Sequence, residues 1–251
     1  MSYQDILNKL ESGELRAATK SDGKWFVNTL VKEEILNAFK DGKLADMKET
    51  GYEGFVDKHN IPARSFKPED GVRLVPGGSS VRTGSFVASG VIIMPPAYIN
   101  IGAYVDSGSM IDSHALVGSC AQIGKNVHLS AGVQIGGVLE PIGMNPVIIE
   151  DNCFVGAGAV IVEGVLVCEN AVIAPGVILS KGTPVYDCVN ERVFMAKEGI
   201  PKDAVVVPGS RPVNKSNAWA NKLNINLQCA VIIKYRDEKT DGALELESFL
   251  R

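Results

Sequence analysis

The clearest pattern along the chain is a hydrophobic residue at every sixth position through its middle. Ten consecutive positions of this register are aliphatic, namely Val81, Val87, Ile93, Ile99, Val105, Ile111, Val117, Ile123, Leu129 and Ile135. A second register with the same period holds Ile149, Val155, Ile161, Val167, Ile173, Leu179 and Val185. A period of six fits neither the 3.6-residue turn of a helix nor the simple alternation of a strand, so the chain carries an internal repeat.

Each hexad predicts one short strand and one corner of a triangular prism. The aliphatic residue points into the prism, and three hexads complete a coil that stacks in parallel register on the next coil. Glycines such as Gly84, Gly102 and Gly176 lie among the hexads, where tight corners favour them. The pattern therefore predicts a mainly β protein built on a parallel β-helix.

The repeat breaks once, because Ile135 and Ile149 are fourteen positions apart instead of twelve. The segment 139–146, LEPIGMNP, is therefore predicted to leave the prism as a loop. A loop fixed to a rigid scaffold is a common place for binding residues, although an inert surface excursion gives the same sequence signal.

The segments on either side lack the hexads and predict caps at the two ends of the prism. We expect an N-terminal α+β cap at residues 1–75, the β-helix at residues 76–209 and a C-terminal cap at residues 210–251. In the C-terminal cap, QCAVIIKYR predicts a strand and LELESFLR predicts a short helix.

The N-terminal cap has three local signals. Ser2 can cap a helix that runs through Leu10, and residues 21–23 are typical of a hairpin turn. A second amphipathic segment predicts a helix that ends at Gly42.

Composition restricts the class of partner. Charged residues make up 22% of the chain and the net charge is -4, which excludes the basic excess of a nucleic-acid-binding protein. The N-terminus is polar, and no apolar run reaches the ~20 residues of a membrane helix, so we expect a cytoplasmic protein without a membrane partner. The cysteines are odd in number and form no CxxC pair, which argues against disulfides and against a zinc or other metal site; they are Cys120, Cys153, Cys168, Cys188 and Cys229.

Two long stretches carry a family resemblance. The run YINIGAYVDSGSMIDSHALVGSCAQIGKNVHLSAGVQIGGVLEP and the run NPVIIEDNCFVGAGAVIVEGV resemble the tetrahydrodipicolinate N-succinyltransferase family, and so do GVRLVPGGSSVRTGSF and CAVIIKYRDEKTDGALELESFLR. The resemblance implies a left-handed β-helix and a homotrimer that binds acyl-CoA between neighbouring prisms. It also implies transfer of a succinyl group from succinyl-CoA to the amine of ring-opened tetrahydrodipicolinate, in diaminopimelate and lysine biosynthesis.

The resemblance assigns three residues to the acceptor. Asp112, in MIDSH, matches the family aspartate that orients the amine and assists its deprotonation; directly after the inward Ile111, it should face outward. Its structural alternative is an Asx turn at a corner. Arg73, in GVRLVP, matches an arginine that contacts the dicarboxylate, with a surface salt bridge as the alternative. Gly137 matches a glycine whose N–H binds a carboxylate or the oxyanion, whereas His128 is expected to hydrogen bond between coils.

The acyl-CoA site is predicted from small corner residues and from two cations. Its candidates are Gly156, Ala157, Ala174 and Gly176, where a pantetheine arm could run close to the backbone, and Lys181 and Arg211, which could meet phosphates. Solvated lysines and arginines on the prism surface are the alternative for the last two.

One stretch departs from the family pattern. After NCF the succinyltransferases usually read Gly-Ala-Arg-Ser-Glu, with a glutamate proposed to act in catalysis, whereas this chain has Gly158 and Val160 at the arginine and glutamate positions. Glu163 lies three residues further on. Loss of the arginine would suit a donor without a second carboxylate, so an N-acetyltransferase that uses acetyl-CoA is the alternative. A non-catalytic scaffold and a zinc enzyme with three facing histidines are alternatives of other classes.

Overall fold

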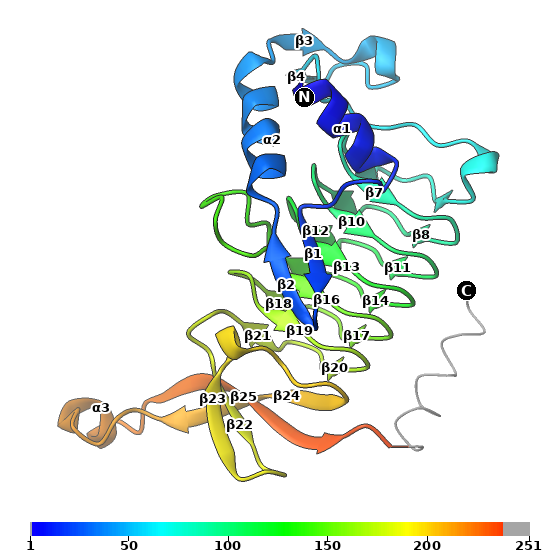
Figure 1. The fold of residues 1–251 in the computed structure, drawn as a ribbon. Helices are drawn as coiled ribbons and strands as arrows, with labels where there is room; N and C mark the ends of the chain where they lie inside the picture. The colour runs from blue at the N-terminus through cyan, green and yellow to red at the C-terminus, as the bar shows by residue number, and fades with distance from the viewer. Residues whose placement is uncertain (1, 238–251) are drawn as a thin grey trace.

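The middle of the chain winds into a prism with three flat faces in the computed structural model, which describes residues 2–237 (Figure 1). The first face consists of β7 (Phe86–Val87), β10 (Tyr104–Val105), β13 (Gln122–Ile123), β16 (Ile148–Ile149) and β19 (Leu166–Val167). The second face consists of β5 (Arg73–Leu74), β8 (Ile92–Ile93), β11 (Met110–Ile111), β14 (His128–Leu129), β17 (Phe154–Val155) and β20 (Val172–Ile173). The third face consists of β6 (Ser80–Val81), β9 (Tyr98–Ile99), β12 (Leu116–Val117), β15 (Gln134–Ile135), β18 (Val160–Ile161) and β21 (Ile178–Leu179).

The hexads account for this geometry. Each strand pairs in parallel with the strand one coil away, so that Met110 lies opposite His128 and Ile111 opposite Leu129. The second residue of each strand points inward, and Ile111 and Leu129 have no exposed surface. The predicted β-helix and its inward aliphatic ladder are confirmed.

The prism begins slightly earlier than the sequence suggested. Arg73 N donates to Val91 O (3.0 Å) and Leu74 pairs with Ile93, so β5 is the first strand of the second face. The residues 73–74 that we had placed in the N-terminal cap therefore belong to the first coil.

The one long coil contains the loop. Tyr104 pairs with Gln122, 18 residues on, whereas Gln122 pairs with Ile148, 26 residues on. The fourteen-residue step from Ile135 to Ile149 therefore consists of one hexad and eight inserted residues. Counting in multiples of six suggested an insertion of two, and that number was wrong.

The N-terminal segment forms a small α+β unit beside the prism, with α1 (Tyr3–Glu11), β1 (Ala18–Ser21), β2 (Lys24–Val27), α2 (Thr29–Asp41), β3 (Leu44–Asp46), η1 (Lys48–Thr50), β4 (Val56–Lys58) and η2 (Pro68–Asp70). Ser2 caps α1 by accepting from Asp5 N, and α2 ends at Gly42, as predicted. The turn between β1 and β2 has positive φ at Asp22 and Gly23, which confirms the predicted hairpin.

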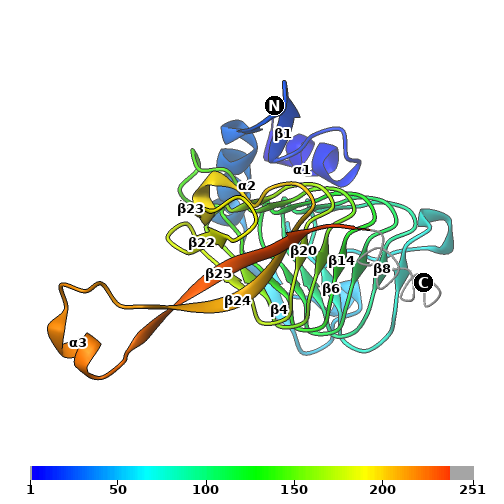
Figure 2. The ribbon, with the colours of Figure 1, turned by 90° about the horizontal axis from the view of Figure 1, so that it is seen from below.

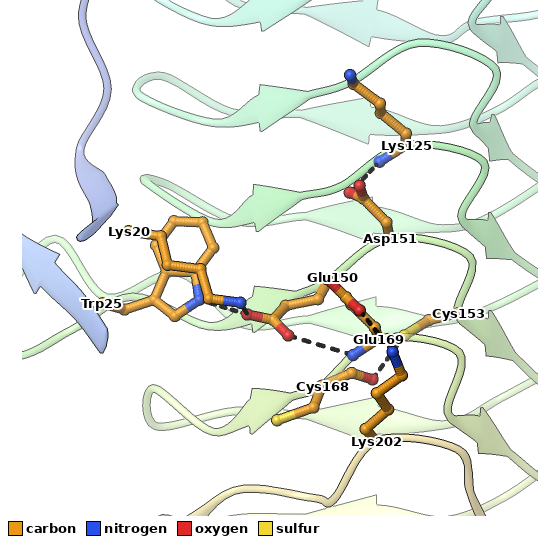
Figure 3. A network of polar contacts seen from close by, with 9 residues as sticks. All are labelled: Lys20, Trp25, Lys125, Glu150, Asp151, Cys153, Cys168, Glu169 and Lys202. Atoms are coloured by element: carbon orange, nitrogen blue, oxygen red, sulfur yellow. Dashed lines mark hydrogen bonds and ion pairs between the residues drawn. The ribbon is translucent and has the colours of Figure 1, made fainter. Parts of the chain in front are cut away.

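The β1–β2 hairpin is fastened to the prism by Glu150, which is 8% exposed (Figure 3). This carboxylate pairs with Lys20 Nζ (2.7 Å) and accepts from Trp25 Nε1 (2.8 Å). It also accepts from Glu169 N (3.2 Å) in the next coil. One buried acid thus joins the hairpin to two coils, and buried ionised groups need such multiple partners.

A second apolar core lies between the N-terminal unit and the prism. Its buried members are Ile6, Leu7, Leu10, Ala17, Val31, Ile35, Ala38, Ile61, Ile101 and Cys120. Leu139 of the inserted loop packs against it. The loop is therefore held on its inner side by the N-terminal unit rather than standing free.

The C-terminal segment forms a ribbon across the last coil and beyond it (Figure 2). Its elements are β22 (Pro184–Asp187), β23 (Arg192–Met195), η3 (Ala196–Glu198), β24 (Ala204–Pro212), α3 (Ala218–Lys222) and β25 (Asn226–Tyr235). β24 continues the second face by pairing with β20, and it runs across the boundary that we had expected at residue 209. The strand predicted from QCAVIIKYR is β25, whereas the helix predicted from LELESFLR falls outside the described residues.

Asp187 ties the β22–β23 hairpin to β25. It is 1% exposed and accepts from Asn190 Nδ2 (2.9 Å), Tyr235 Oη (2.8 Å) and Arg192 Nε (3.0 Å). Burial acts to raise the pKa of Asp187, but these hydrogen bonds outweigh it and hold the pKa well below its usual range.

Replacing Asp187 by asparagine is expected to lower the free energy of unfolding by about 1.5–3 kcal/mol at pH 7, because charge-assisted bonds are lost. Since the pKa of Asp187 is depressed in the folded state, its contribution is complete above the unfolded-state pKa of about 4. The contribution disappears as the pH falls towards the folded-state pKa. Urea denaturation at pH 7 and pH 3 measures this, and a difference that stays constant between the two would contradict it.

Candidate active site

Asp112 lies on the edge where the second face turns into the third, which we call the Asp112 edge (residues 112–115, 130–133, 156–159 and 174–177). Backbone bonds stack these corners: Asp112 N donates to Leu129 O (2.9 Å), and Gly156 N donates to Ile173 O (2.7 Å). Because parallel strands are ~4.8 Å apart, Asp112 and Gly156 are about 10 Å apart along this edge.

The Asp112 carboxylate faces outward and is 32% exposed. Its Oδ1 accepts from Ser113 N (2.7 Å), so the Asx turn that we gave as the structural alternative is present. Asp106 makes the same bond to Ser107 N (2.7 Å) on another edge. The turn uses Oδ1 alone, which leaves Oδ2 to accept a proton from a substrate.

His128 lies in the next coil along the chain, beside Asp112. Its Nε2 is 4.0 Å from Asp112 Oδ2, and its ring meets the Phe154 ring edge to face at 5.1 Å. His128 is 9% exposed. The 18-residue period of the coils predicts this neighbourhood, which our sequence analysis did not identify.

Arg73 is exposed on β5, two coils before Asp112, on the second face of the prism. Within residues 2–237 the Arg73 guanidinium makes no salt bridge. Its alternative role as half of a surface ion pair therefore has no partner in the part of the chain that is described.

The small residues predicted for acyl-CoA share the Asp112 edge. Gly156 is buried, and a Cβ there would lie 2.5 Å from Pro175 N, so glycine at this position is required by the stacking of coils. Ala157 and Gly176 are exposed, and a Cβ at Gly176 would meet no atom within 4 Å. Together with Ala174, they give this edge only small side chains or none.

Gly137 and Lys181 lie on a different edge, where the third face turns into the first. We call it the loop edge (residues 118–121, 136–147, 162–165 and 180–183). Gly137 is exposed. The residues on either side of it are bonded to neighbouring coils, since Gly136 N donates to Ile161 O (2.8 Å) and Val138 N donates to Ser119 O (3.2 Å). The third face therefore separates Gly137 from Asp112 within one chain.

Glu163 also lies on the loop edge. Its Oε2 accepts from the backbone N of Lys181 (3.0 Å) in the next coil, and its φ of 58° fits the corner. Glu163 therefore stabilises a corner away from Asp112, and it does not replace the missing family glutamate beside Asp112 in the same chain.

Arg211 lies on the ribbon beyond the last coil, where β24 pairs it with Leu227 of β25. It is partly buried near Cys229. Burial raises the pKa of the Cys229 thiol, and the charge of Arg211 opposes this rise in part. The structure does not bring Arg211 to the corners that hold Asp112 or Gly137.

The third face carries an open hollow between these two edges. Its lining includes Ser80, Tyr98, His114, Leu116 and Gln134, and His114 belongs to the same corner as Asp112. Val160 points outward on this face in β18, between Gln134 and Ile178 of the neighbouring strands. The position of the family glutamate therefore lies on the face that joins the two edges.

The described residues lack two kinds of feature, a metal-binding cluster and a membrane-spanning helix. Residues 2–237 contain no group of three or more His, Cys, Asp and Glu side chains placed to hold a metal ion. None of the helices in that range has the length and apolarity needed to cross a bilayer.

Neither a motif nor the family resemblance pointed to Lys32 of α2, which has no exposed surface. Its Nζ donates to Met144 O (2.6 Å) in the inserted loop. The helical period would have indicated it, because Lys32 shares a helix face with Ile35 and Phe39.

Two segments of the chain match known protein families. Residues 3–40 match a family described as tetrahydrodipicolinate N-succinyltransferase N-terminal. Residues 146–181 match the hexapeptide repeat of succinyl-transferase. A solved structure from Campylobacter jejuni, described as a putative 2,3,4,5-tetrahydropyridine-2-carboxylate N-succinyltransferase, superposes with a TM-score of 0.53 and 19% identity over 92% of this chain and 63% of that one. This likeness supports the fold, a left-handed parallel β-helix with a small N-terminal domain.

Curated relatives extend the similarity over almost the whole chain. A protein of Ralstonia nicotianae named 2,3,4,5-tetrahydropyridine-2,6-dicarboxylate N-succinyltransferase is 46% identical over 98% of this chain and 87% of its own length. A protein of the same name from Paraburkholderia phymatum is 47% identical over 98% of this chain and 86% of its own length. The chain therefore belongs to the tetrahydrodipicolinate N-succinyltransferase family.

Proposed function

We propose that this protein is a CoA-dependent N-acyltransferase that transfers a succinyl group from succinyl-CoA to tetrahydrodipicolinate, in diaminopimelate and lysine biosynthesis. The observation that carries the proposal is the 46% identity, over 98% of the chain, to relatives named for this reaction. A cytoplasmic location, where a CoA thioester is available, belongs to the same proposal.

The chemistry needs a neutral amine, a proton acceptor and a donor to the oxyanion. Asp112 Oδ2 accepts the proton as the amine attacks the thioester carbonyl, and the CoA thiolate then leaves. Gly137, an exposed residue at the start of the loop, is the candidate to donate its N–H to the oxyanion or to a substrate carboxylate. Arg73 binds a carboxylate of the acceptor, for which the planar guanidinium is well suited.

We place the complete site between two chains of a homotrimer. Asp112 and Gly137 stand on opposite sides of the third face, which supports a site formed by the Asp112 edge of one chain and the loop edge of the next. A threefold arrangement of prisms repeats such a cleft three times. Acyl-CoA then lies along Ala157, Ala174 and Gly176, with Lys181 and Arg211 available to its phosphates.

The identity of the acyl group depends on the departure at Gly158 and Val160. Without the family arginine and glutamate, the neighbouring outward residues Gln134 and Ile178 are uncharged. This observation favours a second candidate, an N-acetyltransferase that uses acetyl-CoA, since an acetyl group has no carboxylate to bind.

Steady-state kinetics with the two thioesters decide between the donors. With tetrahydrodipicolinate or L-2-aminopimelate as acceptor, kcat/KM is expected to be at least about tenfold higher for succinyl-CoA than for acetyl-CoA. The reverse preference would contradict succinyl transfer and establish the acetyl alternative.

A thermal-shift titration with CoA is the control for the scaffold alternative. A ligand that binds the folded state raises the melting temperature as its concentration increases. Absence of both turnover and a CoA-dependent shift would favour a non-catalytic scaffold.

A further inference from the structure

The inserted loop is attached to the N-terminal unit at three places. Lys32 Nζ of α2 donates to Met144 O (2.6 Å), and Asn145 Nδ2 donates to Trp25 O (3.3 Å). Leu139 packs against the core that the N-terminal unit shares with the prism. The loop thus has a defined position, set by residues more than 100 positions earlier in the sequence.

The Lys32 contact is unusual because the ammonium is completely buried. The other buried residues of α2 are the apolar Val31, Ile35 and Ala38, and Met144 O is the one hydrogen-bond partner of the ammonium among the described residues. Burial lowers the pKa of Lys32 below its usual value. The nearby Cys120 is buried too, and burial raises the pKa of its thiol to about 12, so it supplies no ordinary counter-charge.

A lysine at this position is a poor choice for stability alone. Burying a charge is unfavourable, and an apolar side chain of similar volume usually packs in such a place at no loss of stability. A fixed donor to the loop backbone, however, can be supplied by lysine and not by methionine or leucine. The buried ammonium therefore indicates a role in the loop.

We propose that Lys32 is a positioning residue that holds residues 139–146 against the N-terminal unit, so that the loop forms one wall of the acceptor site beside Gly137. This inference rests on the proposed function for the role of Gly137. It assigns the N-terminal unit a part in substrate binding. Lys32 acts through the Met144 carbonyl and does not touch the substrate.

The test compares Lys32→Met with Lys40→Met, which removes an exposed lysine from the same helix. For Lys32→Met we expect a melting temperature equal to or above that of wild type, KM for the acceptor raised about tenfold, and KM for acyl-CoA within about twofold. Lys40→Met should match wild type throughout. Unchanged acceptor KM in Lys32→Met, or an equal rise of both KM values, would overturn the proposal.

Hydrogen exchange of the loop amides separates this inference from the proposed function. Exchange across residues 139–146 is expected to become at least about tenfold faster in Lys32→Met, with the strands of the prism unaffected. This readout does not depend on catalysis, so wild-type protein without transferase activity would remove the proposed function alone. Unchanged loop exchange would remove the role of Lys32.

A second variant covers the case in which Lys32→Met does not fold. Asn145→Ala removes the other polar contact from the loop side and leaves α2 intact. It should likewise raise the acceptor KM and loosen the loop, whereas Lys32→Arg, which keeps a donor, should restore part of the acceptor affinity. If Asn145→Ala changed neither the acceptor KM nor the exchange of the loop amides, and Lys32→Arg restored no acceptor affinity, the proposal would be contradicted.

Discussion

Replacing Asp112 by asparagine is expected to lower kcat/KM by about 10²- to 10⁴-fold, the usual contribution of a general base, while the melting temperature stays within a few degrees of wild type. The amide retains an oxygen that can accept from Ser113 N, so the corner keeps its hydrogen bond (2.7 Å in the native protein). What the variant loses is the basic oxygen near His128. Steady-state kinetics and thermal unfolding measure the two effects separately.

Asp106→Asn is the matched control. Asp106 Oδ1 accepts from Ser107 N at the same 2.7 Å, on the edge between the first and second faces. This control should keep full activity. If Asp112→Asn turned over at a rate near that of wild type, Asp112 would have only its corner role, and an equal loss in Asp106→Asn would attribute the effect to corner geometry.

The architecture was predictable because the hexads encode it directly. Outside the coil that carries the inserted loop, an inward aliphatic residue such as Ile111 is separated from its neighbour in the next coil by 18 residues, and this spacing fixes strand, face and pairing together. The local signals of the N-terminal unit, such as Ser2 and Gly42, were equally readable, since caps and turns depend on a few adjacent residues.

The size of the insertion was not predictable from the same pattern. Fourteen positions between Ile135 and Ile149 can be one hexad with eight extra residues or two hexads with two extra residues. The choice depends on which strand Ile149 joins, and it pairs with Ile123 of the first face. Pairing over such a distance is decided by the packing of the whole coil, including the loop contacts to α2.

The family pattern proposes Asp112 and Gly137 as site residues, but it does not show how they are arranged. The coil geometry places them on two edges that the width of the third face separates. Contacts between distant segments, such as Lys32 with Met144, leave no local signal apart from a charged residue on an apolar helix face. These contacts connect the N-terminal unit to the proposed chemistry.

The inward ladder should also decide stability, and β21 offers a matched pair for testing it. Leu179 has no exposed surface, whereas the adjacent Ile178 is 42% exposed. Leu179→Ala is expected to lower the free energy of unfolding by about 2–5 kcal/mol, because it leaves a cavity between coils that cannot collapse. Ile178→Ala should lower it by less than about 1 kcal/mol.

Chemical denaturation of the two variants measures this difference. Both substitutions remove aliphatic carbons from the same short strand, so strand propensity changes in a similar way and the difference isolates burial. Equal losses would mean that the outward side of β21 is buried as deeply as the ladder, as it would be if a neighbouring chain covered the third face. The same pair of variants therefore tests the hexad ladder and, through Ile178, whether a neighbouring chain covers the third face in solution.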